Sequence, residues 1–301
     1  MRAVVFDELG GPEVLRLADV DEPVARQGQV KLQVEAAGVN PADGKLRDGS
    51  MRIRRTETLP AIPGFEAAGV VVEVGEGVTD IAIGDEVFGF TVSGSYAAYA
   101  LARTVARKPA GLGWAEAAAL PTATEAADRA LDLLEVADGD TVLINGAAGA
   151  VGSVGVQLAE LRGATVIGTA SPVNHDYLRT LGAIPVAYGD GLVDRVRAAS
   201  PDGVDAVFDV AGRGALPAAI ELRGGTTDRI VTIADPAADD YGVMSSSKSR
   251  RSADALARWA HLAVTGRLRI TIAETYSFAD AAQAAARVET GHGHGKIVLL
   301  P

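Results

Sequence analysis

Short runs rich in apolar residues fill the first third of the chain. The runs are RAVVF, QVKLQVEAAGV, GVVVEVG, GDEVFGF and GSYAAYALA, and turn-forming Gly, Pro and Asp residues separate them. Runs of this length between turn signals are typical of β-strands. Because helical periodicity is weak here, the pattern predicts a compact β-rich domain, either a barrel or a sandwich.

From about Pro121 the pattern changes to an alternation of strands and helices. After an Ala- and Leu-rich helix over 122–134, the expected strands are 141–145, 164–169, 184–188, 204–209 and 228–233. The helices expected between them are 150–162, 173–181, 191–199 and 214–222. This order predicts βαβ units and a parallel sheet with helices on both faces.

The last part of the chain begins with a polar stretch, 235–250, which is expected to be a surface loop. The elements expected after it are a helix over 252–265, a strand near 268–275, a helix over 279–289 and a final strand in GKIVLLP. The sequence therefore predicts an α/β protein with a β-rich part and a βαβ part.

Composition limits the classes of function. The chain has 301 residues, enough for two domains and a sizeable core, and its net charge of −11 argues against nucleic acid or an anionic membrane surface as a partner. The absence of cysteine excludes disulfides, thiolate catalysis and zinc sites built on sulfur. Acidic residues in MRAVVFDELGG stand where a signal peptide is apolar, and no apolar run approaches the roughly 20 residues of a membrane span. A cytoplasmic protein with a small-molecule substrate is expected.

The stretch INGAAGAVGS, residues 144–153, joins a predicted strand to a predicted helix. Residues 147–152 have the G-x-G-x-x-G spacing of dinucleotide-binding turns, with Ala147 in place of the first glycine. In such turns unpaired N–H groups at the helix N-terminus attract phosphate, Gly149 lets the diphosphate approach, and Gly152 lets the helix pack on its strand. An ordinary Gly/Ala-rich turn is the alternative. The candidate cofactor-binding residues are Ala147, Ala148, Gly149, Ala150, Val151 and Gly152.

The end of the second strand of the βαβ part distinguishes NAD from NADP. An NAD site carries an Asp or Glu there, which binds the ribose 2′-OH. This chain instead has Ser171, Asn174 and His175, which donate hydrogen bonds and do not repel a 2′-phosphate. The sequence therefore favours NADP(H), although Ser171 is equally suited to cap the following helix.

Seven segments carry a family resemblance. They are AAGVNPADGKLRDG (36–49), LPAIPGFEAAGVVVEVGEGV (59–78), GDEVFGF (84–90), AAGAVGSVGVQLA (147–159), TASPVNHDYLRTLGA (169–183), VDAVFDVAG (204–212) and GKIVLLP (295–301). In this order, and over essentially the whole chain, they resemble the zinc-independent medium-chain dehydrogenase/reductases, the quinone and alkenal oxidoreductases. The resemblance implies a GroES-like β-rich catalytic domain over 1–115 and 266–301. It also implies a Rossmann NADP-binding domain with a doubly wound parallel sheet over 116–265, a cofactor in the cleft between the domains, and a homodimer.

Two positions separate the chain from the zinc-dependent relatives. Where those carry a ligand cysteine the chain has Asn40, and where they carry a ligand histidine before Glu66 it has Phe65, so no catalytic zinc is expected. The resemblance then implies metal-independent hydride transfer from NADPH to quinones or α,β-unsaturated carbonyls, because hydrogen-bond donors stabilise the resulting charge. A pathway-specific enoyl reductase, for example in polyketide biosynthesis, and a non-catalytic NADPH-binding sensor or structural protein are the alternatives.

The resemblance also implies roles for single residues. It places Asn40 at the nicotinamide carboxamide or the substrate oxygen, and Lys45 near developing negative charge with Asp43 orienting it. A turn residue, a surface lysine and a helix cap are the respective alternatives. The remaining implied cofactor contacts, at the ends of later strands of the βαβ part, are Tyr188, Ala211, Gly212, Ile233 and Ala234.

Some positions depart from the family pattern or carry weaker candidates. Where many relatives carry a tyrosine, this chain has Lys45, Met51 and Arg52, and a threonine common near the nicotinamide is replaced by Ala126; these two departures leave the proton donor and the substrate open. A lysine frequent after the second strand of the βαβ part is replaced by Asn174, which weakens the contact with the phosphate but does not reverse the preference for NADP. Glu66, Lys248 and Arg250 are further candidates for the cleft or for a phosphate contact. His292 and His294 in TGHGHGK supply at most half a metal site, so a flexible turn and no metal are expected.

Overall fold

The computed structural model describes residues 1–51, 59–246, 249–291 and 293–301, which divide into two compact units. Unit 1 comprises Met1–Thr122, Arg251–His292 and Lys296–Pro301, and unit 2 comprises Ala123–Arg250 and Gly293–Gly295. These units differ from the division expected from the sequence mainly in the segment 251–265, which lies in unit 1. The reason is that its helix α8 (Ala253–Val264) packs against strand β6 (Tyr99–Arg107) of the β-rich part.

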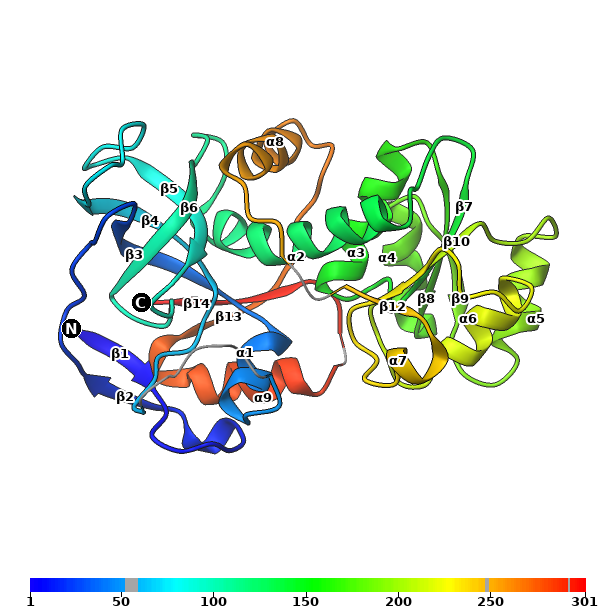
Figure 1. Ribbon diagram of the computed structural model, residues 1–301, viewed down its shortest axis with the longest axis horizontal. Coiled ribbons are helices and arrows are strands. Elements are labelled where there is room, and N and C mark those ends of the chain that lie inside the picture. Colours follow the sequence, from blue (N-terminus) through cyan, green and yellow to red (C-terminus); the bar gives the residue numbers. More distant parts are fainter. Residues whose placement is uncertain (52–58, 247–248, 292) are drawn as a thin grey trace. The chain divides into compact units, whose positions relative to one another are not determined.

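Unit 1 contains a six-stranded sheet in the order β13-β14-β3-β4-β5-β6 (Figure 1). Its strands besides β6 are β3 (Val30–Val39), β4 (Glu66–Val74), β5 (Glu86–Thr91), β13 (Ile272–Ser277) and β14 (Lys296–Leu300). Strand β3 also pairs with β6, so β3 to β6 close into a small barrel. Alternate residues of β3, Val30 and Leu32, point into an apolar cluster with Val71 and Val87, which confirms the strand predicted in this run.

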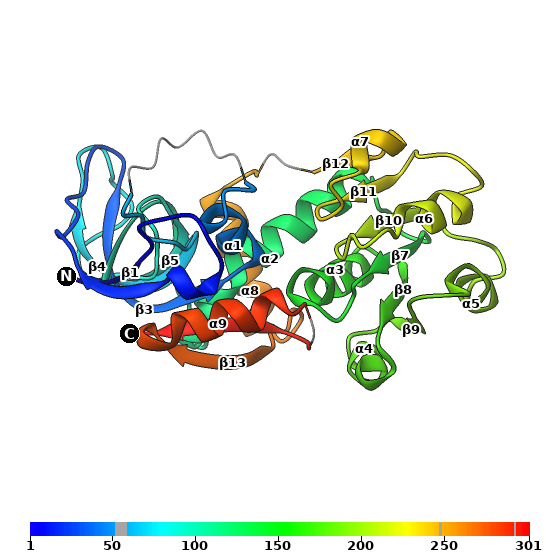
Figure 2. The same ribbon diagram turned by 90° about the horizontal axis from the view of Figure 1, so that it is seen from below.

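Smaller elements surround this sheet. Strands β1 (Arg2–Val5) and β2 (Arg16–Asp19) form an antiparallel pair, with the short helix η1 (Pro12–Val14) between them. Helix α1 (Pro41–Arg47) follows β3, and α9 (Ala281–Glu289), preceded by η3 (Phe278–Asp280), packs against α1 and β14 (Figures 1 and 2). Helix α2 (Trp114–Leu133) begins in unit 1 and continues into unit 2, so it starts earlier than the sequence pattern indicates.

Unit 2 is a parallel α/β domain. Its sheet has the order β12-β11-β10-β7-β8-β9, and every pairing in it is parallel. The strands are β7 (Thr141–Asn145), β8 (Thr165–Ala170), β9 (Ile184–Ala187), β10 (Ala206–Asp209), β11 (Ile230–Thr232) and β12 (Met244–Ser245). This is the doubly wound Rossmann order, in which the direction of winding reverses between β7 and β10. The predicted fold class is therefore confirmed.

Helices cover both faces of the unit 2 sheet (Figure 2). They are α3 (Ala150–Leu161), η2 (Pro172–Asn174), α4 (His175–Thr180), α5 (Leu192–Ala199) and α6 (Leu216–Leu222). On one face, Val196 of α5 and Leu216 of α6 join the cluster that contains Leu143. On the other face α3 lies close, since a Cβ at Gly155 would be 3.4 Å from Ile144 Cδ1. Successive residues of β7 thus serve opposite faces, which explains its continuous apolar run.

The stretch 235–250 is not simply a surface loop. It contains helix α7 (Ala238–Tyr241) and strand β12, which extends the sheet beside β11. A strand of two residues is too short to show an alternating pattern, so the sequence signal for it is absent.

Candidate functional site

The turn between β7 and α3 is hydrogen-bonded to the neighbouring strand β8. The Gly146 amide donates to Thr169 Oγ1 at 2.9 Å, and the Ala147 amide donates to the Thr169 carbonyl at 3.0 Å. Gly146 has φ +78°, the left-handed region that glycine tolerates. The chain then enters α3, whose first-turn amides at Ala150, Val151 and Gly152 have no acceptor within the helix.

Gly149 and Gly152 are glycines for different reasons. A Cβ at Gly152 would lie 2.2 Å from the Gly146 carbonyl oxygen and 2.7 Å from Ala147 Cα, so α3 could not pack on the turn. At Gly149 the φ angle is −68°, and a Cβ would meet only the Gly146 oxygen, at an ordinary 3.4 Å. Neither backbone conformation nor packing requires a glycine at 149. A bare backbone there instead suits a ligand that approaches the amides closely, as a diphosphate does.

Two buried side chains shape the loops after β10 and β11. Asp209 accepts hydrogen bonds from the amides of Ala211 (3.2 Å) and Gly212 (3.1 Å) and from the Thr232 hydroxyl (2.7 Å). Burial raises the pKa of Asp209, against these hydrogen bonds, which lower it. Thr232 Oγ1 in turn accepts from the amide of Ala234 at 3.1 Å. Each loop is therefore fixed at the strand end by a side chain that bonds its backbone.

The structure brings part of the predicted set together. Gly146 lies beside Ala211, because a Cβ on Gly146 would be 3.1 Å from Ala211 Cβ. The predicted residues Gly212, Ile233 and Ala234 lie in the loops after β10 and β11, at the same carboxyl edge of the sheet. Sequence reasoning missed Asp209 and Thr232 as the groups that hold these loops. The available signal was the position of each polar residue at the end of an apolar strand.

The ends of β8 and β9 carry the residues predicted to select NADP(H). Asn174 is buried and its amide nitrogen donates to Ser171 Oγ at 3.2 Å, while the His175 ring contacts the Ala170 carbonyl at 3.3 Å. Tyr188 follows β9 and is 57% exposed. The Arg195 guanidinium binds the carbonyls of the loop that carries Tyr188, including that of Ala187 at 2.9 Å. Ser171 directly follows β8 and is the N-cap residue of η2.

Asn145, the last residue of β7, is a second group that the sequence analysis did not identify. Its side chain is 3% exposed, and neither Oδ1 nor Nδ2 has a hydrogen-bond partner in the part of the chain that the structure describes. An unpaired buried amide is unfavourable by about 1–3 kcal/mol. Together with Gly149, where neither conformation nor packing requires a glycine, this orphaned amide beside the turn fits a site that is completed by a bound polar molecule.

Unit 1 holds a buried polar cluster around the predicted residue Asn40. The Lys296 ammonium donates to Asn40 Oδ1 at 2.6 Å and to Glu66 Oε1 at 2.5 Å. The side-chain nitrogen Nδ2 of Asn40 donates to the same carboxylate oxygen at 2.8 Å. Glu66 Oε2 accepts from the Thr122 amide at 2.7 Å. Glu66 and Lys296 are 0% and 2% exposed. Both ends of the Asn40 side chain are therefore fixed, by a carboxylate and by an ammonium group.

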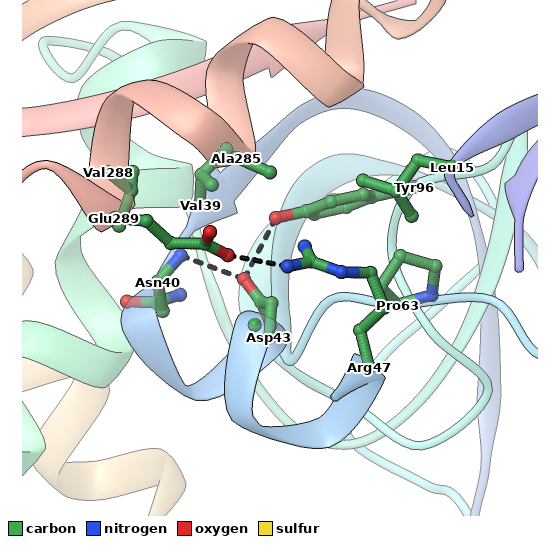
Figure 3. Close-up of a pocket in the computed structure, with 11 residues that line it drawn as sticks. Leu15, Val39, Asn40, Asp43, Arg47, Pro63, Tyr96, Ala285, Val288 and Glu289 are labelled. Carbon is green, nitrogen blue, oxygen red and sulfur yellow. Dashed lines mark hydrogen bonds and ion pairs between the residues drawn. The ribbon is translucent and has the colours of Figure 1, made fainter. Parts of the chain in front are cut away.

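Asp43 has a capping role in the structure. Its Oδ2 accepts from the backbone N–H of Asn40 at 2.7 Å, at the start of α1, and from the Tyr96 hydroxyl at 2.8 Å (Figure 3). Burial raises the pKa of Asp43 to about 7. Lys45 is exposed on α1. Asp43 thus makes the capping hydrogen bond with Asn40 and is not described in an ion pair with Lys45.

The cavity beside Asp43 is small. It is lined by Leu15, Val39, Asn40, Asp43, Gly44, Arg47, Pro63, Tyr96, Ala285, Val288 and Glu289, and Figure 3 shows the Arg47–Glu289 ion pair at its edge. Its volume is about 10 Å³, enough for about one water molecule. A nicotinamide ring or a quinone cannot enter it.

The weaker candidates are spread over the chain. The backbone N–H of Arg250 donates to the Glu125 carboxylate at 2.6 Å, an interaction within unit 2. Ala126 is buried in α2. Lys248, Arg52 and His292 lie outside the described residues. Within the described ranges, no three His, Cys, Asp or Glu side chains gather to form a potential metal site. No helix in those ranges is long and apolar enough to cross a membrane.

Comparison with known proteins identifies close relatives. The family described as "Alcohol dehydrogenase GroES-like domain" matches residues 26–127, and the one described as "Zinc-binding dehydrogenase" matches residues 181–299. The NADPH-dependent alkenal/one oxidoreductase of Arabidopsis thaliana chloroplasts is 32% identical over 318 aligned positions, covering 100% of this chain and 80% of the relative.

Solved structures agree with this. The quinone oxidoreductase of Coxiella burnetii matches with a TM-score of 0.90 and 34% identity, over 100% of this chain and 99% of the other. A mycobacterial protein solved in complex with NADPH matches with a TM-score of 0.87 and 27% identity, over 100% of both chains.

Proposed function

The chain belongs to the quinone oxidoreductase and alkenal/one oxidoreductase branch of the medium-chain dehydrogenase/reductases, and we propose that it transfers hydride from NADPH to quinones or α,β-unsaturated carbonyls. The observation that carries the proposal is the turn at Gly149. Its bare backbone, the first-turn amides of α3, which have no acceptor within the helix, and the orphaned Asn145 side chain form a site that suits a dinucleotide diphosphate.

Each part of unit 2 would hold one part of the nucleotide. The amides of the turn bind the diphosphate, and Ser171 and Asn174 donate to the 2′-phosphate. Tyr188, exposed after β9, packs near the adenosine half. The loops fixed by Asp209 and Thr232 carry the predicted contacts to the nicotinamide half, in accord with ligand binding at the carboxyl ends of strands.

The buried cluster of unit 1 supports chemistry without zinc. Asn40 stands in place of a ligand cysteine, and its carbonyl oxygen already accepts from the Lys296 ammonium. A metal ion at Asn40 and Glu66 would have to displace this ammonium or lie beside it, and like charges repel. Asn and Phe65 also lack the thiolate and imidazole that zinc prefers.

Metal-free hydride transfer favours substrates that are already electrophilic. Bound NADPH would supply the hydride. Reduction of a quinone to a hydroquinone takes up one hydride and one proton, and reduction of an enone does the same across its conjugated double bond. The negative charge spreads onto the substrate oxygen, where fixed N–H or O–H donors stabilise it. Asn40 and Lys45 are the proposed donors, and the proton comes from a side chain or from water.

The proposal is tested by NADPH consumption with a panel of benzoquinones, naphthoquinones, 2-alkenals and enones. Gly149→Val should abolish turnover and NADPH binding, because the φ angle accepts valine and its Cβ fits, whereas the bulk of the side chain covers the amides. Gly111→Val is the matched control, since its Cβ would also meet only ordinary contacts, at 3.7 Å from Val264. Equal NADPH affinity in wild type and Gly149→Val would contradict the proposal.

The same panel separates the alternatives. Tight NADPH binding without turnover on any acceptor would favour a non-catalytic sensor or structural protein, and turnover only on carrier-bound enoyl thioesters would favour a pathway-specific enoyl reductase. We further propose that the protein is cytoplasmic, as its composition suggests, and that it forms a homodimer, as the resemblance implies. Sedimentation at working concentration tests the oligomeric state.

A further inference from the structure

One histidine of the segment TGHGHGK lies beside the proposed phosphate-binding turn. Residues 293–295 belong to unit 2, although the chain continues directly into β14 of unit 1. Gly295 forms a parallel bridge with Gly149, the residue before α3. The His294 ring centroid is 4.6 Å from that of Tyr177 in α4. His294 therefore lies where the turn before α3 and the first part of α4 are neighbours.

We propose that His294 contacts the 2′-phosphate of NADPH and contributes to its selection over NADH. This inference rests on the proposed function, which assigns Ser171 and Asn174 to the same phosphate. Ser171 precedes η2, and Asn174 directly precedes α4, the helix whose Tyr177 ring contacts the imidazole. The side chain of His294 is exposed, so its N–H is accessible to a ligand.

The site needs a further donor. Ser171 and Asn174 carry no charge, and the Asn174 amide already donates to Ser171 Oγ. A ring nitrogen of His175, the third predicted donor, already contacts the Ala170 carbonyl. A terminal phosphate presents three acceptor oxygens, which uncharged donors of this number satisfy only in part. An imidazole supplied by the tail segment adds an N–H donor, without bringing the carboxylate that an NAD site uses.

Tyr177 acts as a positioning residue in this arrangement. The tilted ring contact, with planes 34° apart, restricts the imidazole of an otherwise glycine-flanked residue. Gly293 and Gly295 both have positive φ, so the backbone on either side is in a conformation that other residues rarely adopt. Restriction of the ring before binding reduces the entropy lost when the phosphate binds.

The experiment measures the dissociation constants of NADPH and NADH with the full-length protein. For His294→Ala we expect NADPH to bind about three- to tenfold more weakly, the effect of losing one ordinary hydrogen bond, with no change for NADH. His261→Ala removes an exposed imidazole from α8 of unit 1 and is the matched control. Tyr177→Phe should retain the NADPH affinity and Tyr177→Leu should reproduce part of the His294→Ala loss.

A second probe isolates the 2′-phosphate from the rest of the nucleotide. Adenosine 2′,5′-bisphosphate should bind wild type more tightly than adenosine 5′-monophosphate, and His294→Ala should narrow that difference. Equal losses for NADPH and NADH, or an unchanged difference between the two adenosine phosphates, would overturn the role of His294 while leaving the proposed function intact. Failure of wild type to bind either dinucleotide would instead overturn the proposed function itself.

Discussion

The two units use their buried polar side chains in opposite ways. In unit 1, Asn40, Glu66 and Lys296 bond mainly to one another, so their hydrogen-bonding capacity is largely used inside the fold. In unit 2, Asp209 and Thr232 bond the backbone amides of the loops that follow their strands. The first arrangement stabilises the interior of unit 1, and the second fixes the shape of the loops that follow the strands of unit 2.

Because of this difference, we expect substitutions in the unit 1 cluster to act mainly on the stability of the protein and those at the strand ends of unit 2 to act mainly on cofactor binding. A change in the unit 1 cluster leaves a charge or an amide unpaired in a buried environment, so its main effect falls on folding. A change at the strand ends of unit 2 alters loops that the proposed cofactor touches, so its effect on affinity exceeds what its effect on folding would suggest. The predictions below test this separation.

The largest effect is expected for Lys296→Met. The substitution leaves the Glu66 carboxylate buried without its ammonium partner, which should lower the free energy of unfolding by about 3–5 kcal/mol. Denaturant titration of the full chain measures it. Lys31→Met is the control, because Lys31 pairs with Glu22 and Glu73 on the surface, where such pairs contribute about 0–1 kcal/mol. A Lys296→Met loss no larger than the Lys31→Met loss would contradict the comparison.

The next effect is the pH dependence set by Asp43. Burial raises its pKa to about 7 from its ordinary value of 3.8, so between these pH values the folded protein holds a proton that the unfolded chain releases. The contribution to stability is therefore full below about pH 4 and is lost as pH rises through 7, by at most about 1.4 kcal/mol per pH unit. Asp43→Asn should flatten this slope in unfolding curves recorded across the window. An unchanged slope would show that other groups determine it.

The sequence pattern was sufficient for the fold wherever an element was long and regular. The alternating run that became β3 and the apolar run that became β7 are both fixed by local periodicity and by burial on one or two faces. The two-residue strand β12 was missed because its place in the sheet depends on pairing with β11, which local sequence does not encode.

The candidate site was predictable to the same degree. The glycine turn has a local signature, and the structure places its residues between β7 and α3 as expected. Lys296 was missed because its partners are 256 and 230 residues away in the chain, so nothing near GKIVLLP indicates a buried ion pair. Asn40 was identified by resemblance, but its fixation by Glu66 and Lys296 became visible only in three dimensions.

A smaller effect is expected for Thr232→Val, which keeps the shape of the side chain and removes its hydroxyl. Asp209 loses a donor, and the amides of Ala234 and Asp235 lose an acceptor, which should lower stability by about 1–3 kcal/mol. The NADPH affinity of the folded protein should fall as well, because the loop after β11 loosens. Thr165→Val, at the exposed start of β8, is the control for both measurements. If Thr232→Val lowered the stability but left the NADPH affinity unchanged, the Thr232 hydroxyl would contribute to folding and not to cofactor binding.

The smallest effect is expected for Ser171→Asp, which changes only the charge at the end of β8. The new carboxylate repels a 2′-phosphate and accepts a hydrogen bond from the ribose 2′-OH of NADH. The ratio of NADPH to NADH affinity should therefore fall about tenfold, a difference of about 1.4 kcal/mol. Stability should change little, because Ser171 is half-buried and its hydroxyl accepts only from Asn174 among the described contacts. Thr180→Asp adds the same charge at the far end of α4 and should leave the ratio unchanged. Equal ratios for the two variants would mean that the end of β8 does not face the phosphate.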